Sequence, residues 1–211
     1  MIHNGYFLNI SPFPHLFNIT LAEYVVFIPK GNFTVNDAYT LLPFSNTMFN
    51  LVMTGQQIKN VLEDAINFYL DPSGSWGAYP RASGLRFDVN EALPFGSRVS
   101  NMEVNAKLEG TWSAIDMSAT YTVVTNNYIA GSKDGYFEFG NVDDSLKEDT
   151  FVEYAQSFIE YAESVKVLEP VPADRASTQN WSDVVPPTSG SYKTSVARMA
   201  GIMFVLISFS L

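Results

Sequence analysis

Histidine is scarce in this chain, and its position limits the metal chemistry that the chain can support. The two histidines, His3 and His15, both lie within the first fifteen residues, and the sequence has no cysteine. A pair of metal ions that activates water needs several imidazoles and carboxylates that converge on one point. Residues 30 to 175 contain carboxylates but no histidine. We therefore predict neither a metal site nor a set of catalytic residues in this chain.

Composition places the chain among globular proteins and argues against nucleic acid as a partner. Its 211 residues are 46% hydrophobic and 14% aromatic, enough for one large core with tails. The formal net charge is −10, from 22 acidic and 12 basic residues. A phosphate backbone would therefore meet repulsion over most of the surface.

The order of apolar residues predicts interspersed strands and helices. Alternation over 47–53 predicts a strand, and short punctuated runs at 85–89, 99–104 and 121–125 predict three more. Between them, apolar residues at spacings of three and four from Ile58 to Tyr69 predict a helix of about 15 residues, with Thr54 as its N-cap. Because no βα unit repeats, the class expected is α+β, a mixed sheet with helical layers.

A second helix is predicted near residue 150. Thr150-Phe-Val-Glu153 spells a capping box, and one broad apolar face follows. That face is formed by Phe151, Tyr154, Ala155, Phe158, Ile159, Ala162 and Val165.

Three segments carry a resemblance to a known family. They are Gly31-Asn-Phe-Thr-Val-Asn-Asp-Ala-Tyr-Thr-Leu-Leu-Pro-Phe44-Ser-Asn, Thr54-Gly-Gln-Gln-Ile-Lys-Asn-Val-Leu-Glu63 and Asn127-Tyr128-Ile-Ala-Gly-Ser-Lys-Asp134-Gly-Tyr136, with Gly77-Ala-Tyr-Pro-Arg-Ala-Ser-Gly-Leu-Arg-Phe-Asp between the last two. Their order and spacing over residues 28–170 resemble the C-terminal, substrate-binding domain of the 5'-nucleotidases. The resemblance implies that domain's mixed sheet with helical layers.

The resemblance also implies a nucleoside site. In the family two aromatic rings hold the base between them, at positions that correspond to Phe44 and Tyr128, and a carboxylate that corresponds to Asp134 accepts hydrogen bonds from the ribose hydroxyls. Stacking on a base contributes about 1–3 kcal/mol and tolerates several bases. The alternatives are that both rings are core aromatics, and that Asp134 is a turn residue in Ser-Lys-Asp-Gly.

The chain also departs from the family pattern. The family's Asn-Gly-Gly-Gly-Ile-Arg precedes an Ile-Pro that matches Ile28-Pro29; here Thr20 and Val25 stand at its Asn and Arg positions, and valine cannot clamp a phosphate. Small residues usually precede the aspartate, whereas this chain has Ser132-Lys133, and Lys133 either pairs with phosphate or faces solvent. Residues 1–27 are therefore expected to be irregular, foreign to the domain or a truncated start. The metallophosphoesterase domain that would hold divalent metals such as zinc has no counterpart here.

The ends of the chain suggest where the parent protein resides. The opening stretch lacks a basic region before an apolar run, so it does not predict a signal peptide. Residues 171–191 have the composition of a Pro/Ser/Thr-rich linker, and the small residues Ser189, Gly190 and Ser191 precede the apolar tail of segment 192–211. This order resembles a glycosylphosphatidylinositol anchor signal; a truncated transmembrane helix or a buried apolar tail is the alternative. Asn32 and Asn180 begin glycosylation triplets.

The leading hypothesis is a nucleoside- or nucleotide-binding domain of a 5'-nucleotidase, an enzyme of nucleotide catabolism that hydrolyses nucleoside 5'-monophosphates, here in a chain that is not catalytic alone. The parent protein would be extracellular or at the cell surface, held by a lipid anchor. One alternative is a non-catalytic surface recognition glycoprotein that reuses the fold. Another is a fragment of a cyclic-nucleotide phosphodiesterase or a nucleotide-sugar hydrolase with the same domain plan.

Overall fold

The computed structural model describes residues 2–3, 16–20, 25–26, 31–105, 111–169, 172, 174 and 176–183. Its strands are β1 (Ile2–His3), β2 (Leu16–Thr20), β3 (Val25–Val26), β4 (Thr47–Thr54), β5 (Arg81–Ser83), β6 (Leu85–Asn90), β7 (Val99–Val104), β8 (Ser113–Ala114), β9 (Thr120–Asn126), β10 (Lys147–Glu153) and β11 (Gln179–Ser182). Its helices are α1 (Val35–Leu41), α2 (Gly55–Leu70), α3 (Asn127–Ala130) and α4 (Tyr154–Val165), with 3-10 turns η1 (Trp76–Ala78), η2 (Phe137–Asn141) and η3 (Asp144–Leu146).

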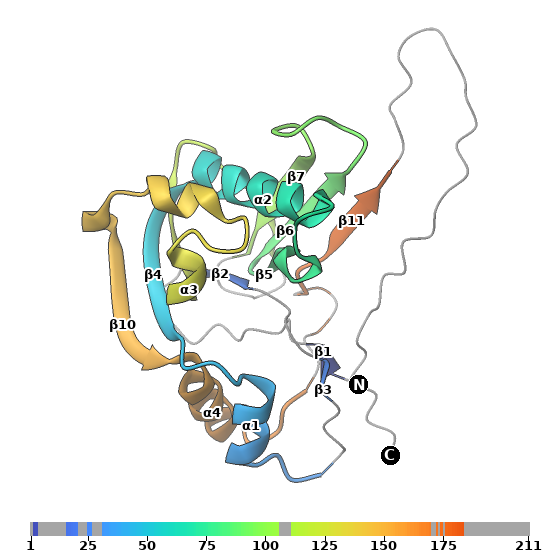
Figure 1. Cartoon of the computed structure of the whole chain (residues 1–211). Helices are drawn as coiled ribbons and strands as arrows, with labels where there is room; N and C mark the ends of the chain where they lie inside the picture. The colour runs from blue at the N-terminus through green and yellow to red at the C-terminus, as the bar shows by residue number, and fades with distance from the viewer. Residues whose placement is uncertain are drawn as a thin grey trace, which may run out of the picture.

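Two mixed sheets organise the fold, as Figure 1 shows. One has the strand order β10-β4-β9-β2-β5 and the other β11-β6-β7-β8, while β1 and β3 form a separate pair. Strand β2 runs parallel to β9, and β11 runs parallel to β6, whereas the other pairs are antiparallel. The predicted class, α+β with a mixed sheet and helical layers, is confirmed.

Helix α2 is the centre of the main core, and its sequence explains where it starts. Thr54 accepts a hydrogen bond from the backbone N–H of Gln57, and the side chain of Gln57 accepts one from the N–H of Thr54, which completes a capping box. Its apolar stripe is buried among residues of both sheets. The predicted helix and N-cap are therefore confirmed, as are the strands predicted at 47–53, 85–89, 99–104 and 121–125.

A smaller core lies at the other end of β4. Helices α1 and α4 lie side by side there (Figure 1). The cluster is formed by Leu41, Leu42, Met48, Val124, Tyr154 and Ala155, with Phe158 packed against it. It anchors the loop that joins α1 to β4, which carries one of the predicted site residues.

The predicted capping box at residue 150 is wrong. Residues 147–153 form β10, α4 begins at Tyr154, and Phe151 is 84% exposed with φ 57° instead of lying on the apolar face. The hydroxyl of Thr150 donates to the backbone oxygen of Met48, and the N–H of Phe151 donates to Asp149. These bonds form a bulge that local periodicity cannot reveal, because its partner strand is about a hundred residues away.

Two strands lie where the sequence predicted irregular chain. Residues 16–20 form β2, inside the stretch expected to be irregular, and residues 179–182 form β11, inside the expected linker. Both strands are short, and both depend on partners distant in sequence: β2 pairs with β9 and β5, and β11 with β6. Pairing of this kind leaves no signal in the local order of residues.

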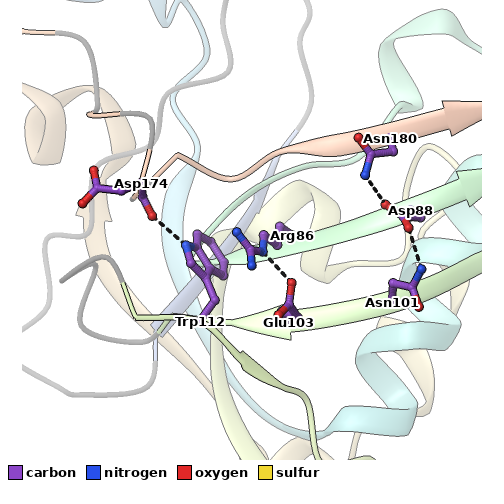
Figure 2. A network of polar contacts seen from close by, with 7 residues as sticks. All are labelled: Arg86, Asp88, Asn101, Glu103, Trp112, Asp174 and Asn180. Atoms are coloured by element: carbon purple, nitrogen blue, oxygen red, sulfur yellow. Dashed lines mark hydrogen bonds and ion pairs between the residues drawn. The ribbon is translucent and has the colours of Figure 1, made fainter.

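Polar contacts fasten the segment around β11 to the second sheet (Figure 2). Asp88 on β6 accepts hydrogen bonds of 2.6 Å from the side-chain amides of Asn180 and Asn101. Nearby, Trp112 donates to the backbone oxygen of Asp174 at 2.8 Å. The glycosylation triplet at Asn180 therefore lies in a paired strand, although its asparagine is exposed.

The predicted anchor residues Ser189, Gly190 and Ser191 and the apolar tail lie outside the described residues. Within the part of the chain that the structure describes, no helix combines the length and the apolar character needed to cross a membrane.

Candidate functional site

Phe44 lies in the loop between α1 and β4 and points out of the core. Leu41 and Leu42, just before it, are buried, whereas Phe44 is 42% exposed. Its backbone N–H donates to the hydroxyl oxygen of the buried Tyr154 at 3.4 Å. The hydrogen bond to Tyr154 thus supports the backbone of the loop, while part of the Phe44 ring stays accessible to a ligand.

Tyr128 lies on the short helix α3, directly after β9. The buried side chain of Asn126 caps this helix, because its Oδ1 accepts the N–H of Ile129 at 2.9 Å. Ile129 and Ala130 are buried, while Tyr128 is 42% exposed. The helix therefore presents the tyrosine ring at the surface from a fixed base.

Asp134 lies in a tight turn that follows α3. The N–H of Tyr136 donates to the backbone oxygen of Lys133 at 3.1 Å, and the two central residues, Asp134 and Gly135, have φ values of 51° and 83°. Positive φ at both central positions is the requirement of a type I′ turn, for which Asp-Gly is a favoured sequence. Asp134 is therefore a turn residue, and the same turn directs its carboxylate toward Tyr128.

The turn is anchored in the core. Tyr136 is fully buried, and its hydroxyl donates to the backbone oxygen of Ala78 at 3.0 Å. Burial raises the pKa of Tyr136 well above its usual range, and the nearby Asp134 raises the pKa further, so the phenol stays protonated and keeps donating. Gly135 packs so closely on Phe68 of α2 that a side chain there would overlap it.

Strand pairing brings the three predicted residues to one edge of the five-stranded sheet. Met48 pairs with Asn126, so the loop before β4, with Phe44, and the helix after β9, with Tyr128, leave the sheet at the same end. The hydroxyl of Tyr128 donates to Oδ1 of Asp134 at 3.1 Å. The edge therefore combines two accessible rings with a carboxylate that is already hydrogen-bonded to one of them.

Sequence reasoning missed the residues that support this arrangement. Tyr154 and Asn126 hold the two loops, and Phe68 bears on the turn. Only Asn126 had a local signal, because asparagine before a short helix is a common N-cap. Tyr154 supports Phe44 across more than a hundred residues of sequence, which no local pattern predicts.

Comparison with known proteins identifies the family. The family model described as "5'-nucleotidase, C-terminal domain" matches residues 16–140, more than half of the chain. The chain belongs to the 5'-nucleotidase family. The match includes Phe44, Tyr128 and Asp134, and it begins at β2, ahead of the boundary expected at residue 28.

Sequence and structure searches found consistent relatives. The "NAD 5'-nucleotidase" of Haemophilus influenzae is 39% identical over 163 residues, covering 75% of this chain and 27% of the relative. The "Probable 5'-nucleotidase" of Treponema pallidum is 40% identical over 141 residues, covering 66% of this chain and 23% of the relative. The solved structure of Haemophilus influenzae NAD nucleotidase matches with a TM-score of 0.70 and 38% identity, covering 80% of this chain and 30% of that one. The chain thus spans about a quarter to a third of these 5'-nucleotidases.

Acidic side chains on α2 are engaged in hydrogen bonds to the backbone. Among the described residues, no group of three or more His, Cys, Asp or Glu side chains is arranged to hold an ion. Glu63 and Asp64 on α2 instead accept backbone N–H groups of the loop at 96–99 and of Glu138. Thr20 and Val25, which the sequence analysis aligned with an Asn and an Arg of the family pattern, lie at the end of β2 and in β3.

Proposed function

We propose that this chain is the nucleoside-binding domain of a 5'-nucleotidase and that the base stacks between Phe44 and Tyr128 while Asp134 accepts the ribose hydroxyls. The observation that supports this most directly is the pairing of Met48 with Asn126, which sends both aromatic residues out at one edge of the sheet. Each of the two rings is 42% exposed, which leaves part of its face open to a planar ligand.

The chemistry of the three residues suits a nucleoside. Every purine or pyrimidine has a π-face, so a pair of rings binds several bases with similar strength. A carboxylate offers about four acceptor positions, enough to take both hydrogens of a vicinal diol as well as a hydroxyl of the protein. We expect binding of adenosine or AMP in the range of about 1 mM, because one stack and one diol must offset the entropy of association.

Titration followed by NMR tests the site. Phe44→Ala and Tyr128→Ala should each weaken adenosine binding by about 5- to 150-fold, the equivalent of about 1–3 kcal/mol per stack. Phe95→Ala is a matched control, because Phe95 is also more than a third exposed but lies in the loop between β6 and β7 of the other sheet. The clamp assignment fails if the spectral changes of the two site variants match those of the wild type.

The substrate of the parent enzyme is part of this proposal. Hydrolysis of a nucleoside 5'-monophosphate fits the family, and the name of the Haemophilus relative adds NAD as a candidate. AMP and NAD titrated in parallel would separate the two, since tighter binding of NAD requires contacts beyond one base and one ribose.

Catalysis, we propose, belongs to the part of the relatives that this chain does not span. The support is the coverage, 27% and 23% of the two sequence relatives, together with the lack of histidine in residues 30–175. The isolated chain should release no phosphate from AMP in the presence of zinc or manganese. Phosphate release that persists after repeated purification and exceeds a buffer blank would contradict this.

The parent protein is proposed to work outside the cell, held at its surface by a lipid anchor. The support is the order of Pro/Ser/Thr-rich segment, small trio and apolar tail in the sequence. Expressed behind a signal peptide, the protein should be released from cells by a phosphatidylinositol-specific phospholipase and carry glycan at Asn32 or Asn180. Surface protein that resists the enzyme and keeps an epitope placed after Leu211 would show that the tail is retained.

A further inference from the structure

The contact between Tyr128 and Asp134 gives the tyrosine two functions. Its ring is accessible, while its hydroxyl donates to Oδ1 of the half-buried Asp134 at 3.1 Å. A phenylalanine would supply the same stacking surface without the hydroxyl. The hydroxyl of Tyr128 thus adds a contact that a phenylalanine would lack, its hydrogen bond to the carboxylate of Asp134.

Both partners of this hydrogen bond are held by separate anchors. Tyr128 lies on a helix capped by the buried Asn126, and Asp134 lies in a turn fixed by the buried Tyr136 and by the approach of Gly135 to Phe68. The bond therefore joins two supported points, and little conformational freedom is lost when it forms. It restrains the two side-chain torsions of Asp134, χ1 and χ2, which the backbone turn leaves free.

That restraint bears on how a ribose would be recognised. With Oδ1 engaged by Tyr128, rotation of the carboxylate is restrained, and Oδ2 keeps its acceptor positions for an incoming hydroxyl. Without the phenol hydroxyl the carboxylate can rotate, and binding of a ligand diol then costs the conformational entropy of ordering it. Base stacking needs no such alignment.

We propose that Tyr128 is a positioning residue for Asp134, and that its hydroxyl sets the preference of the site for a ribose over a sugar without the 2' and 3' hydroxyls. This inference rests on the proposed nucleoside site. It assigns the hydroxyl to sugar recognition and the ring of the same residue to base recognition.

The experiment compares adenosine with 2',3'-dideoxyadenosine by NMR titration or calorimetry. Because a hydrogen bond to a charged group is among the stronger ones, the wild type should prefer adenosine by about tenfold or more. Tyr128→Phe should reduce this preference to about a third or less, while the affinity for dideoxyadenosine changes less than about twofold. Tyr128→Ala should weaken both ligands.

Two further variants show whether the hydroxyl acts through Asp134. Asp134→Asn should lose the preference on its own, and adding Tyr128→Phe to it should cause no further loss, as expected of two groups that act as one unit. The control is Tyr121→Phe, which removes a hydroxyl that accepts the N–H of Asp116 near the opposite end of β9. It should leave the preference unchanged.

The outcomes separate this proposal from the one it rests on. If the wild type binds neither nucleoside, or if Phe44→Ala and Tyr128→Ala have no effect, the nucleoside site is wrong and this inference falls with it. If those variants weaken binding but Tyr128→Phe keeps the wild-type preference, only the role of the hydroxyl is wrong. A lower melting temperature of Tyr128→Phe with an unchanged preference counts as that second result.

Discussion

Gly135 joins the site to the core, and replacing it by alanine tests that connection. The residue has φ 83°, and a Cβ placed on it would lie 2.5 Å from Cγ of Phe68 and closer still to its Cβ. The chain offers a matched position: Gly96 has φ 86°, but a Cβ there would meet nothing within 4 Å. The two glycines have nearly the same positive φ and differ in the space around them.

The expected magnitudes follow from this difference. An L-residue in the left-handed region costs about 1–2 kcal/mol relative to glycine, which is the whole cost expected for Gly96→Ala. Gly135→Ala adds the overlap with a helix that cannot retreat from the core, about 1–3 kcal/mol more. The free energy of unfolding should thus fall further for Gly135→Ala by about 1–3 kcal/mol.

Urea unfolding of both variants measures the two costs. With a slope of about 2 kcal/mol per molar, the midpoint of Gly135→Ala should lie about 1 M below that of Gly96→Ala. Adenosine binding should weaken only in Gly135→Ala, because the displaced turn carries Asp134. Equal midpoints for the two variants would refute the close packing of this turn on α2.

Three other perturbations test the framework around the site. Glu63→Gln should lower the free energy of unfolding by about 1–3 kcal/mol, because the buried carboxylate accepts two backbone N–H groups at 2.7 and 2.9 Å and an amide can accept only at its oxygen; a urea midpoint equal to that of the wild type would contradict this. Burial, followed by the charges of Glu138 and Glu63, raises the pKa of Asp64 while a backbone hydrogen bond lowers it, so folding favours the protonated acid. Asp64→Asn should therefore raise the free energy of unfolding at pH 7 by less than about 1 kcal/mol. This gain should disappear as the pH falls through the raised pKa of folded Asp64 toward its pKa in the unfolded chain. Chemical unfolding at pH 7 and pH 4 tests this, and a gain that is larger at pH 4 than at pH 7 would contradict it. Asp88→Ala removes the acceptor of two 2.6 Å hydrogen bonds and should speed amide exchange in β11, so exchange as slow as in the wild type would show that other contacts hold this strand.

The elements predicted correctly are those whose signals are local. Helix α2 has its capping residues three positions apart and its buried positions at helical spacing, so the chain from Thr54 to Ile66 contains what is needed to recognise it. The same holds for β6, where buried and half-buried residues alternate. Hydrophobic periodicity is informative where one face of one element meets the core.

The errors have a shared physical cause. Phe151 belongs to a strand because Thr150 bonds to Met48 on β4, and β2 and β11 exist because strands far along the chain accept them. A sequence window contains neither partner. Local propensity at Thr150 favoured a cap, and tertiary pairing overrode it.

In the candidate site, too, the sequence predicted which residues take part but not the contact that depends on the fold. Motif order selected Phe44, Tyr128 and Asp134, and the ladder between β4 and β9 accounts for their common edge. The hydrogen bond between Tyr128 and Asp134 was beyond sequence reasoning, because it depends on the positive φ of Asp134 and on a cap that orients α3.

The departure at Ser132-Lys133 shows how this chain keeps the turn without the family's small residues. Ser132 adopts φ 61°. Its side chain lies against Gly140, where a Cβ would come within 2.7 Å of the serine hydroxyl, so the glycine leaves room for that side chain. The backbone oxygen of Lys133 then accepts the hydrogen bond that closes the turn at Tyr136. Because Lys133 serves the turn through its main chain, its side chain is not needed for the geometry. The turn thus accommodates the substitution locally, and Asp134 is still directed toward Tyr128.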